Sequence, residues 1–177
     1  MKQDPIVVPY DPVWPDEFEA LRAVLAPALG ALAVAIHHVG STAIPGMIAK
    51  PVLDIDIELT PGVAVKAATD ALATLGYVYR GDLGVLERYA YGRPSAAVPF
   101  SETRSAWPAH HLYVCPHGSA ELARHLRFRD RLRGSERLRR EYTALKRECL
   151  RRAAGDREVY VDEKARLGSP WFERVLA

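Results

Sequence analysis

The chain has 177 residues, of which 49% are hydrophobic and 26% are charged, and its formal net charge is +2. This composition is typical of a globular protein of one domain and excludes the disordered, fibrous and membrane-spanning classes. Its two cysteines form no Cys-x-x-Cys pair, so neither a disulfide framework nor a zinc site is expected. No apolar run reaches the length of a membrane span and the N-terminus lacks a signal-peptide core, so we expect a cytoplasmic protein that does not enter a membrane.

The predicted elements begin with a helix after Pro15, with Asp16 as its N-cap and apolar residues recurring at helical spacing. We expect Pro27 to end or kink this helix. The apolar stretch 33–39 predicts a buried strand, and 52–59 has the clearest strand pattern in the chain. Further predicted elements are a helix that ends at about residue 75 and short strands over 77–80, 86–91, 96–100 and 110–115.

Helices dominate the remainder of the chain. They are predicted over 120–133, 136–153 and 157–166, with a last short helix that opens at Ser169-Pro170. The expected N-caps are Ser119, Ser135 and Asp156. Residues 1–115 carry 8 Lys and Arg against 12 Asp and Glu, whereas 116–177 carry 16 against 10, so the helical part is basic. The pattern predicts an α+β fold, a mixed β-sheet with C-terminal helices packed over it, in a single domain of residues 1–177 (core about 1–116, helical part about 117–177).

The strand over 52–59 separates two kinds of side chain. Leu53, Ile55, Ile57 and Leu59 alternate with Asp54, Asp56 and Glu58. Successive side chains of a strand point to opposite faces, so the three carboxylates share the face opposite the apolar row. Two carboxylates at i and i+2 lie roughly 6–7 Å apart along the backbone, a spacing that suits hard divalent cations. Asp54 and Asp56 are therefore predicted to hold Mg²⁺, and either metal or the basic C-terminal helices should offset the repulsion within the acidic row.

A Gly-Ser pair precedes this strand by a short loop. Gly40 lets the backbone approach a phosphate closely, and Ser41 adds a hydroxyl donor beside exposed N–H groups. Lys50 contributes a point charge nearby. The sequence thus predicts a phosphate site next to the metal site. An Asp-x-Asp pair alone is more often a solvated strand face, and a Gly-Ser pair alone is a weaker signal, so the prediction depends on their combination.

The segment HVGSTAIPGMIAKPVLDIDI, from His38 to Ile57, resembles the signature of the nucleotidyltransferase superfamily with the DNA polymerase beta fold. Further motifs are HHLYV at 110–114, FRDRLR at 128–133, Tyr-x-x-Leu-Lys at 142–146 and Tyr-x-x-x-Lys at 160–164. With them, the chain is similar to the GrpB-like family of predicted nucleotidyltransferases. The resemblance covers nearly the whole chain.

The resemblance implies a nucleotidyltransferase core in which Gly40 and Ser41 contact the nucleotide phosphates. Asp54 and Asp56 would be catalytic and would hold the metal, Mg²⁺ or Mn²⁺. The implied reaction transfers a nucleotidyl group from a nucleoside triphosphate to an acceptor that the sequence does not identify.

The superfamily usually draws a third carboxylate from a later strand. This chain offers Asp82, Glu87 or, in place of an acid, His111. Relatives commonly read His-x-His at this strand, whereas here His111 is followed by Tyr113, which departs from a two-histidine pattern. His110 shares its strand face with apolar residues and is expected to face the core, so His111 is the candidate ligand or catalytic acid/base.

Several cations are candidates for phosphate binding. Arg129 and Arg133 lie four residues apart on one predicted helix face and could grip phosphates bidentately. Arg129 and Lys146 are expected to neutralise triphosphate charge, with Lys164 and Arg88 as further candidates. The plainer interpretation is an arginine-rich solvated helix, with lysines lying along neighbouring aromatic rings.

One alternative is a non-catalytic nucleotide- or coenzyme-binding module of the same fold, which the missing third carboxylate favours. Nucleic acid is not an expected partner, because acidic residues interrupt the arginine run RLRGSERLRR and the overall charge is small. The nucleobase, the acceptor and the oligomeric state stay open.

Overall fold

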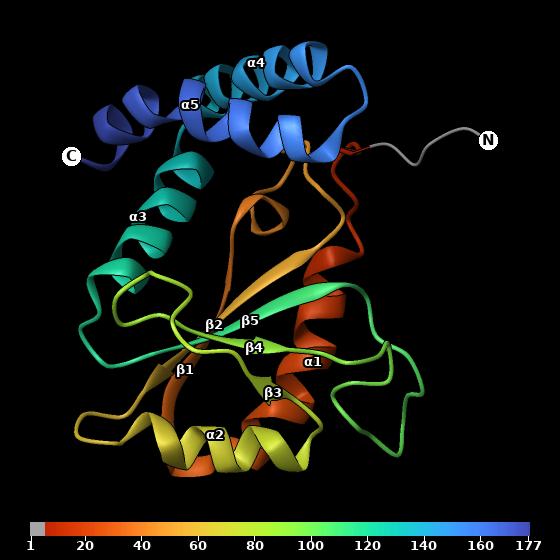
Figure 1. Cartoon of the computed structure of the whole chain (residues 1–177), viewed down its shortest axis with the longest axis vertical. Coiled ribbons are helices and arrows are strands. Elements are labelled where there is room, and N and C mark those ends of the chain that lie inside the picture. Colours follow the sequence, from red (N-terminus) through yellow and green to blue (C-terminus); the bar gives the residue numbers. More distant parts are fainter. Residues whose placement is uncertain (1–5) are drawn as a thin grey trace.

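A computed structural model describes residues 6–177 (Figure 1). In chain order its main elements are α1 (Trp14–Leu29), β1 (Ala33–Val39), β2 (Leu53–Leu59), α2 (Val65–Thr74), β3 (Val78–Tyr79), β4 (Tyr89–Gly92), β5 (His110–Cys115), α3 (Ala120–Gly134), α4 (Glu136–Ala153) and α5 (Arg157–Leu176). Strands occupy the first part and helices the last, which confirms the predicted α+β fold. Within the described residues, no helix has both the length and the hydropathy that crossing a bilayer requires.

The sheet has the strand order β1-β2-β5-β4-β3. β2 and β5 run parallel and the other neighbouring pairs are antiparallel, so the sheet is mixed, as predicted. The β2–β5 register places Asp54 beside His111 and Asp56 beside Tyr113. Residues 57 apart in sequence are thereby brought to one face of the sheet.

One face of the sheet packs against α1 and α2. The apolar side chains of β2 that the alternation predicted are all buried there. They contact Phe18, Leu21 and Leu25 of α1 and Leu72 of α2 in one cluster. Fully burying an aliphatic side chain stabilises the fold by about 1.5–3 kcal/mol, so this cluster holds β2 rigidly and fixes the direction of the carboxylates on its other face.

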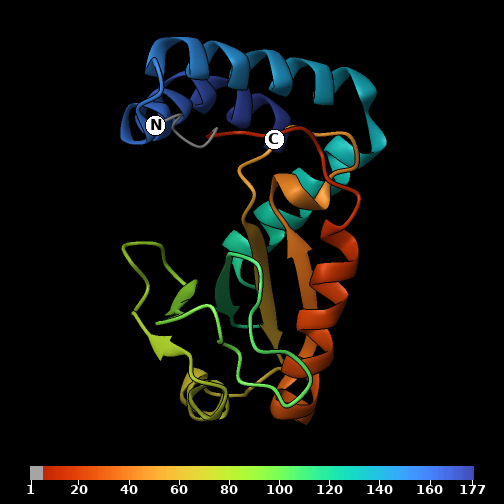
Figure 2. The same ribbon diagram turned by 90° about the vertical axis from the view of Figure 1, so that its right-hand side faces the viewer.

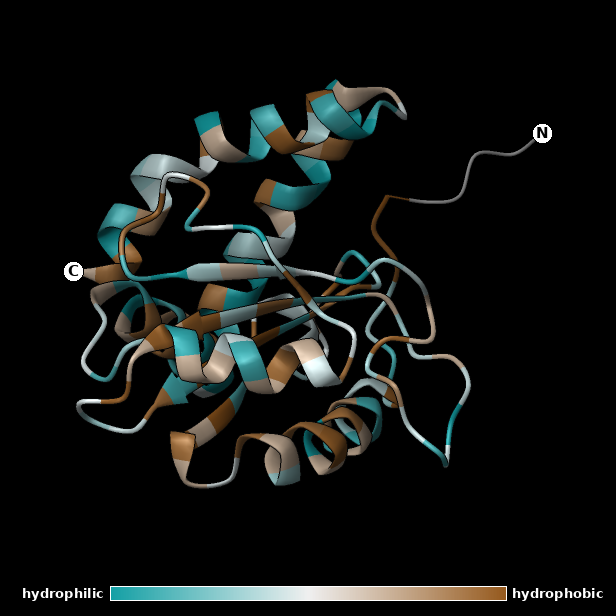
Figure 3. Cartoon of the chain, turned by 60° about the horizontal axis from the view of Figure 1, so that its bottom comes forward, coloured by the Kyte–Doolittle hydropathy of each residue, from teal (hydrophilic) through white to brown (hydrophobic). Residues whose placement is uncertain are grey.

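The C-terminal helices form a second layer of structure beyond one end of the sheet (Figures 1 and 2). Hydrophilic and hydrophobic residues alternate along them (Figure 3), as amphipathic helices require. Tyr142 of α4 stacks on Trp171 of α5 with ring centroids 5.0 Å apart. Ile44 and Met47, from the loop between β1 and β2, are buried in the same cluster, so the loop that follows Gly40-Ser41 is anchored on the helices.

The side chains of Ser119, Ser135 and Asp156 cap α3, α4 and α5 by accepting hydrogen bonds from backbone N–H groups, as predicted. The prediction for α1 was wrong, because this helix begins at Trp14, before Asp16, and a carboxylate oxygen of Asp11 accepts from the Val13 N–H instead.

Two other sequence predictions were wrong. Residues 96–100 form no strand. No separate helix opens at Ser169-Pro170, because α5 runs through Pro170. Pro27 was expected to end or kink α1 and does not end it, since the helix continues to Leu29. Buried apolar residues follow each proline, Leu29 in α1 and Trp171 in α5, so packing maintains the helix where local propensity would end it.

Candidate functional site

Two cavities are lined by residues of the sheet and of the C-terminal helices, and they share Ser41, Asp54 and Lys164. The first, called here the aromatic cavity, has a volume of about 240 Å³ and is lined at one end by Phe128, Tyr142 and Phe172 and at the other by Asp54, Arg88 and Tyr113. The second, called the lysine cavity, has a volume of about 230 Å³ and is lined by Lys50, Lys146, Lys164, Tyr160 and His111, among others. Asp54 therefore lies where the two cavities meet.

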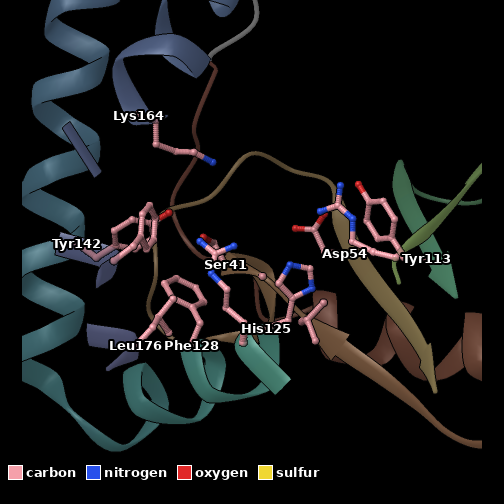
Figure 4. A pocket seen from close by; sticks show the side chains of 13 residues that line it. Ser41, Asp54, Tyr113, His125, Phe128, Tyr142, Lys164 and Leu176 are labelled. Atoms are coloured by element: carbon pink, nitrogen blue, oxygen red, sulfur yellow. The ribbon is translucent and has the colours of Figure 1, made fainter. Parts of the chain in front are cut away.

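Figure 4 shows the aromatic cavity in its long direction. Tyr142 and Phe128 lie on one side, and Asp54 and Tyr113 lie on the opposite side. Ser41 lies between the two ends. A ligand that fills this cavity would therefore meet rings at one end, a hydroxyl in the middle and a carboxylate at the other end.

Gly40 lies directly against the Asp54 carboxylate. Its backbone has φ +69° and ψ −167°, a conformation that is essentially restricted to glycine. A Cβ at this position would lie 2.2 Å from Oδ2 of Asp54. Glycine is required here both by its backbone conformation and by the carboxylate, which contacts the backbone of the Gly-Ser turn.

Each carboxylate of the acidic row on β2 has a histidine partner. Nδ1 of His111 donates to Oδ1 of Asp54 at 2.9 Å. Nδ1 of His125 donates to Oδ2 of Asp56 at 2.7 Å. The two oxygens of Glu58 accept from His37 at 3.0 Å and from His117 at 2.9 Å.

These pairs add to an expectation from the sequence. Metal or the basic C-terminal helices were expected to offset the repulsion along the row, and the structure gives each carboxylate a histidine partner that the sequence did not predict. Of these partners, His125 alone belongs to a C-terminal helix, α3.

Asp56 and His125 form the buried part of the row. Asp56 is 0% exposed, and its Oδ1 has no hydrogen-bond partner among the described residues. Nε2 of His125 lies 3.2 Å from Oε1 of Glu121, so the imidazole is placed between two carboxylates. Burial disfavours the charged form of His125, but the hydrogen bond to Asp56 and the charges of Asp56 and Glu121 outweigh it and raise the pKa of His125.

Three lysines, Lys50, Lys146 and Lys164, meet at the lysine cavity. Within residues 6–177 none of them has a carboxylate at ion-pair distance, although the chain forms many ion pairs elsewhere. Nζ of Lys146 donates to Oγ of Ser41 at 2.7 Å and to the carbonyl oxygen of Ile48 at 2.6 Å. Lys146 is the buried member of the three, and burying a cation costs free energy unless an opposite charge compensates it, so a bound anion would stabilise its charged form.

Burial, followed by the charge of Lys164, lowers the pKa of Lys146 to about 7. Burial and the charge of Lys164 also lower the pKa of Lys50. A bound polyanion would favour the ammonium form of both lysines, so its binding should be coupled to proton uptake near and above neutral pH.

The buried lysine predicts an unusual pH dependence of stability. Between the folded pKa of about 7 and an unfolded value of about 10.4, the unfolded chain holds a proton on Lys146 that the folded chain lacks. Raising the pH through this window therefore favours the folded state, by up to about 1.4 kcal/mol per pH unit. We expect the free energy of unfolding of the wild type to rise from pH 7 to pH 9 relative to that of Lys146→Met, as measured by urea denaturation without ligand.

Lys66→Met is the matched control for this prediction. Lys66 is exposed on α2 and pairs with Asp70, so its substitution should shift the stability equally at each pH. Parallel stability curves for the wild type and Lys146→Met would contradict the prediction.

The carboxylates of β2 offer few ligands to a metal ion. Within the described part of the chain, no three His, Cys, Asp or Glu side chains are arranged to hold one. Mg²⁺ commonly uses one or two carboxylates and takes its other ligands from phosphates and water. Asp54 is open to both cavities, whereas Asp56 is fully buried and lines neither of them, although its Oδ1 has no hydrogen-bond partner in residues 6–177. Asp54, with the free oxygen of Asp56 behind it, thus fits a magnesium ion that takes its other ligands from substrate phosphates and water, and the described residues do not fit an ion held by the protein alone.

The structure brings most of the predicted site residues together. Gly40, Ser41, Lys50, Asp54, Arg88, His111, Lys146 and Lys164 all line one or both cavities. Arg129 lies elsewhere: its Nε donates to Asp130 at 2.7 Å and its Nη1 to the carbonyl oxygen of His38 at 3.2 Å. The two acidic candidates for a third ligand, Asp82 and Glu87, line neither cavity, whereas His111 contacts Asp54.

His110 and His38 have structural roles. Burial lowers the pKa of each to about 4, so both imidazoles are neutral at neutral pH. Nδ1 of His110 donates to the carbonyl oxygen of Pro108, which leaves Nε2 to accept from the Tyr77 hydroxyl at 2.7 Å. As predicted, His110 faces the core and His111 faces the site.

The face of α3 that lines the aromatic cavity was not predicted from the sequence. Arg124, His125 and Phe128 lie on this face, at the helical spacing i, i+1 and i+4. The predicted phosphate ligands Arg129 and Arg133 lie on a different face of the same helix. A helical projection shows that one face combines an arginine, a histidine and an aromatic residue, and this combination could have identified the side that lines the cavity.

The sequence and fold were compared with those of known proteins. The profile of the family described as GrpB protein matches residues 4–177. A UPF0157 protein of Pseudomonas aeruginosa is 35% identical over 173 residues, which cover 97% of this chain and 67% of that protein. A dephospho-CoA kinase of Mycolicibacterium paratuberculosis is 32% identical over 183 residues, which cover 94% of this chain and 44% of that protein. The chain thus spans less than half of the kinase.

Two solved structures share the fold. The crystal structure of the conserved protein GrpB from Enterococcus faecalis superposes with a TM-score of 0.72 at 25% identity, covering 94% of this chain and 99% of that one. Cid1, in complex with its short product ApU, superposes with a TM-score of 0.53 at 10% identity, covering 81% of this chain and 43% of that one. The second likeness concerns the fold alone.

Proposed function

The chain belongs to the GrpB family, and we propose that it is a magnesium-dependent nucleotidyltransferase that transfers a nucleotidyl group from a nucleoside triphosphate to an acceptor. The observation that carries the proposal is the lysine cavity: Lys50, Lys146 and Lys164, without carboxylate partners in residues 6–177, meet beside Ser41 and Asp54. A polyphosphate would supply the missing negative charge, and a triphosphate that extends from the lysines toward the aromatic cavity would pass Asp54, which lines both cavities.

The aromatic cavity accommodates the nucleoside. Phe128, Tyr142 and Phe172 form the wall at one end, and planar rings stack favourably on aromatic side chains. Burial raises the pKa of Tyr142, so its hydroxyl stays protonated and available as a donor. Ser41 and Lys164 belong to both cavities, which allows one ligand to extend from the rings to the lysines.

Asp54 and Asp56 would hold the magnesium ion, which supplies charge neutralisation at the reacting phosphate when it is bound. The remaining groups bind and orient. His111 donates to Asp54 and fixes the direction of that carboxylate, and His125 does the same for Asp56. Lys146 fixes the Ser41 hydroxyl.

The test is a titration of a nonhydrolysable nucleoside triphosphate with Mg²⁺, followed by isothermal calorimetry. We expect the triphosphate to bind more tightly than the monophosphate, and the double variant Lys50→Gln/Lys164→Gln to lose about tenfold or more of the triphosphate affinity, because charge-assisted hydrogen bonds are lost. Lys66→Gln, on the exposed face of α2, should bind as the wild type does. Equal affinity for monophosphate and triphosphate in the wild type would refute the proposed phosphate site.

A second candidate is a nucleotide- or coenzyme-binding module without catalysis. The observation that favours it is the lack of a third carboxylate at β5, where His111 and Tyr113 lie beside Asp54 and Asp56. Similarity to dephospho-CoA kinases that are more than twice as long also fits a module that accompanies another activity. Tight triphosphate binding with no release of pyrophosphate from any acceptor in a small-molecule pool would support this candidate over the enzyme.

A further inference from the structure

We propose that the acceptor is a phosphate monoester, held at the Tyr113 end of the aromatic cavity by Arg88 and Arg124, and that its phosphate oxygen is the nucleophile. This inference depends on the proposed nucleotidyl transfer and names the class of its second substrate. Both arginines line the cavity that Asp54 lines, on the side away from the lysine cavity.

Arg88 is held in place but lacks a close anionic partner. Its guanidinium lies over the ring of Tyr113 at 4.5 Å from the centroid, and its Nε is buried without a hydrogen-bond partner in residues 6–177. Its closest carboxylate oxygen, on Glu121, is 4.0 Å away, which is long for an ion pair. A buried N–H of a guanidinium without an acceptor costs free energy, and a bound anion that re-aims this side chain would recover it.

The loop that carries Arg88 is strained and fixed. Leu83 and Glu87 adopt positive φ angles of 51° and 57°, which non-glycine residues rarely do. The Ser119 hydroxyl, at the N-terminus of α3, donates to the carbonyl oxygen of Glu87 at 3.1 Å. Strained backbone is common at sites where a side chain is held in a defined position. Here the strained loop holds Arg88 at the wall of the cavity.

The two arginines share a single carboxylate at this end of the cavity. Glu121 is shared by Arg124 at 3.1 Å, His125 at 3.2 Å and Arg88 at 4.0 Å. Arg124 is half-exposed, so it can turn toward a ligand at little cost. Among the described residues, Glu121 is the one carboxylate within 4.0 Å of either arginine, so an incoming phosphate would meet two guanidinium groups that have one anionic partner between them.

Among residues 6–177, the side chains that line the cavity include no carboxylate or imidazole free to act as a base for an alcohol acceptor. Among the described residues that line it, Asp54 is the one carboxylate, and it is occupied by His111 and proposed to hold magnesium. Both ring nitrogens of His125 face carboxylates. The free nitrogen of His111 belongs to the lysine cavity. A hydroxyl nucleophile must lose a proton during the reaction, whereas a phosphate dianion has none to lose.

The reaction balances without a base. One oxygen of the acceptor phosphate attacks the α-phosphorus and forms a new P–O bond, while the bond between the α-phosphorus and the oxygen that bridges to the β-phosphate breaks. The electron pair of that bond leaves with pyrophosphate. The product joins the acceptor and the nucleoside through a P–O–P linkage, and nothing is oxidised or reduced.

Inorganic phosphate is the smallest probe of this reaction, because its attack on the α-phosphorus yields a nucleoside diphosphate that carries the probe's phosphorus. The full chain is incubated with Mg²⁺, unlabelled nucleoside triphosphate and ³²P-phosphate, and labelled diphosphate is measured. Hydrolysis of the triphosphate yields unlabelled diphosphate and does not interfere. In parallel, glycerol 3-phosphate and glycerol, with α-labelled triphosphate, form a matched pair of phosphate and alcohol acceptors.

We expect labelled diphosphate and a glycerol 3-phosphate adduct, with no glycerol adduct. Arg88→Gln and Arg124→Gln should each lower the rate about tenfold or more and leave the affinity for the nonhydrolysable triphosphate within about twofold. Arg140→Gln, an exposed arginine paired with Glu136 on α4, is the control.

Three results would overturn the inference. The first is transfer to glycerol, and the second is tight triphosphate binding with no transfer to either phosphate probe. The third is a loss of triphosphate affinity in Arg88→Gln that is as large as its loss of rate. The first two leave the triphosphate site intact and refute the acceptor alone. Failure of the wild type to bind the triphosphate would refute the proposed function and this inference with it. Urea denaturation of each variant separates loss of folding from loss of binding.

Discussion

Replacing Asp54 with asparagine is expected to lower pyrophosphate release by about 10³-fold, because a metal ion at the reacting phosphate is worth several kcal/mol and each 1.36 kcal/mol is a factor of ten in rate. The substitution keeps the size of the side chain and removes its charge. Asp54 is the carboxylate that lines both cavities, so no neighbouring acid can replace it. The measurement is pyrophosphate release from a nucleoside triphosphate with Mg²⁺ and a small-molecule acceptor pool, together with the Mg²⁺ dependence of nonhydrolysable triphosphate binding.

Glu58→Gln is the matched control for Asp54→Asn. Glu58 lies on the same strand and face, accepts from His37 and His117, and lines neither cavity. Its substitution removes a charge from the acidic row without touching the site, so transfer should change little. Equal losses of pyrophosphate release in the two variants would show that the total charge of the row matters, and not Asp54 itself. If the Mg²⁺ dependence of triphosphate binding is unchanged in Asp54→Asn, Asp54 is not a magnesium ligand.

Replacing Gly40 with alanine is expected to remove most of the activity and to destabilise the fold. The backbone conformation of Gly40 costs a non-glycine residue about 1–3 kcal/mol. The added Cβ would also lie 2.2 Å from the Asp54 carboxylate, which must move. We expect a loss of about 2–4 kcal/mol in the free energy of unfolding, measured by urea denaturation, because strain and overpacking add, with loss of Mg²⁺-dependent triphosphate binding.

Gly46→Ala separates the two effects. Gly46 also has a positive φ, 78°, but a Cβ there would meet nothing within 4 Å. It should therefore show the strain without the displacement of Asp54, with a smaller loss of stability and unchanged triphosphate binding. If Gly40→Ala binds the triphosphate as the wild type does, the close approach of Gly40 and Asp54 has no part in the site.

The position of the carboxylates was predictable, but their partners were not. Alternation along 52–59 determines which residues share a face, since it depends on strand geometry alone, and the structure has Asp54, Asp56 and Glu58 on one face as predicted. The histidines that pair with them come from β1, from β5, from the turn after β5 and from α3. Such pairings depend on strand register and helix placement, which one sequence does not encode locally.

The two prolines in helices show where prediction from local sequence fails. Pro27 and Pro170 were expected to interrupt or open helices, and both lie inside continuous ones. The caps at Ser119, Ser135 and Asp156 were predicted correctly, because a cap depends on hydrogen bonds to the next few residues. Helix continuation through proline depends instead on apolar residues beyond it that a distant part of the chain buries.

The sequence by itself determined the α+β class, the rigid acidic strand, the Gly-Ser turn and the lysines that line the cavities, because strand alternation and motif spacing act over short stretches of chain. Only the tertiary structure decided that Lys50, Lys146 and Lys164 meet without a carboxylate among residues 6–177, and that Arg129 lies away from them. It also decided that α3 brings His125 to Asp56 and Phe128 into the aromatic cavity. The reason is that a site built from a sheet and three helices depends on how those elements pack. Packing depends on many contacts between residues far apart in sequence, which a local sequence pattern does not reveal.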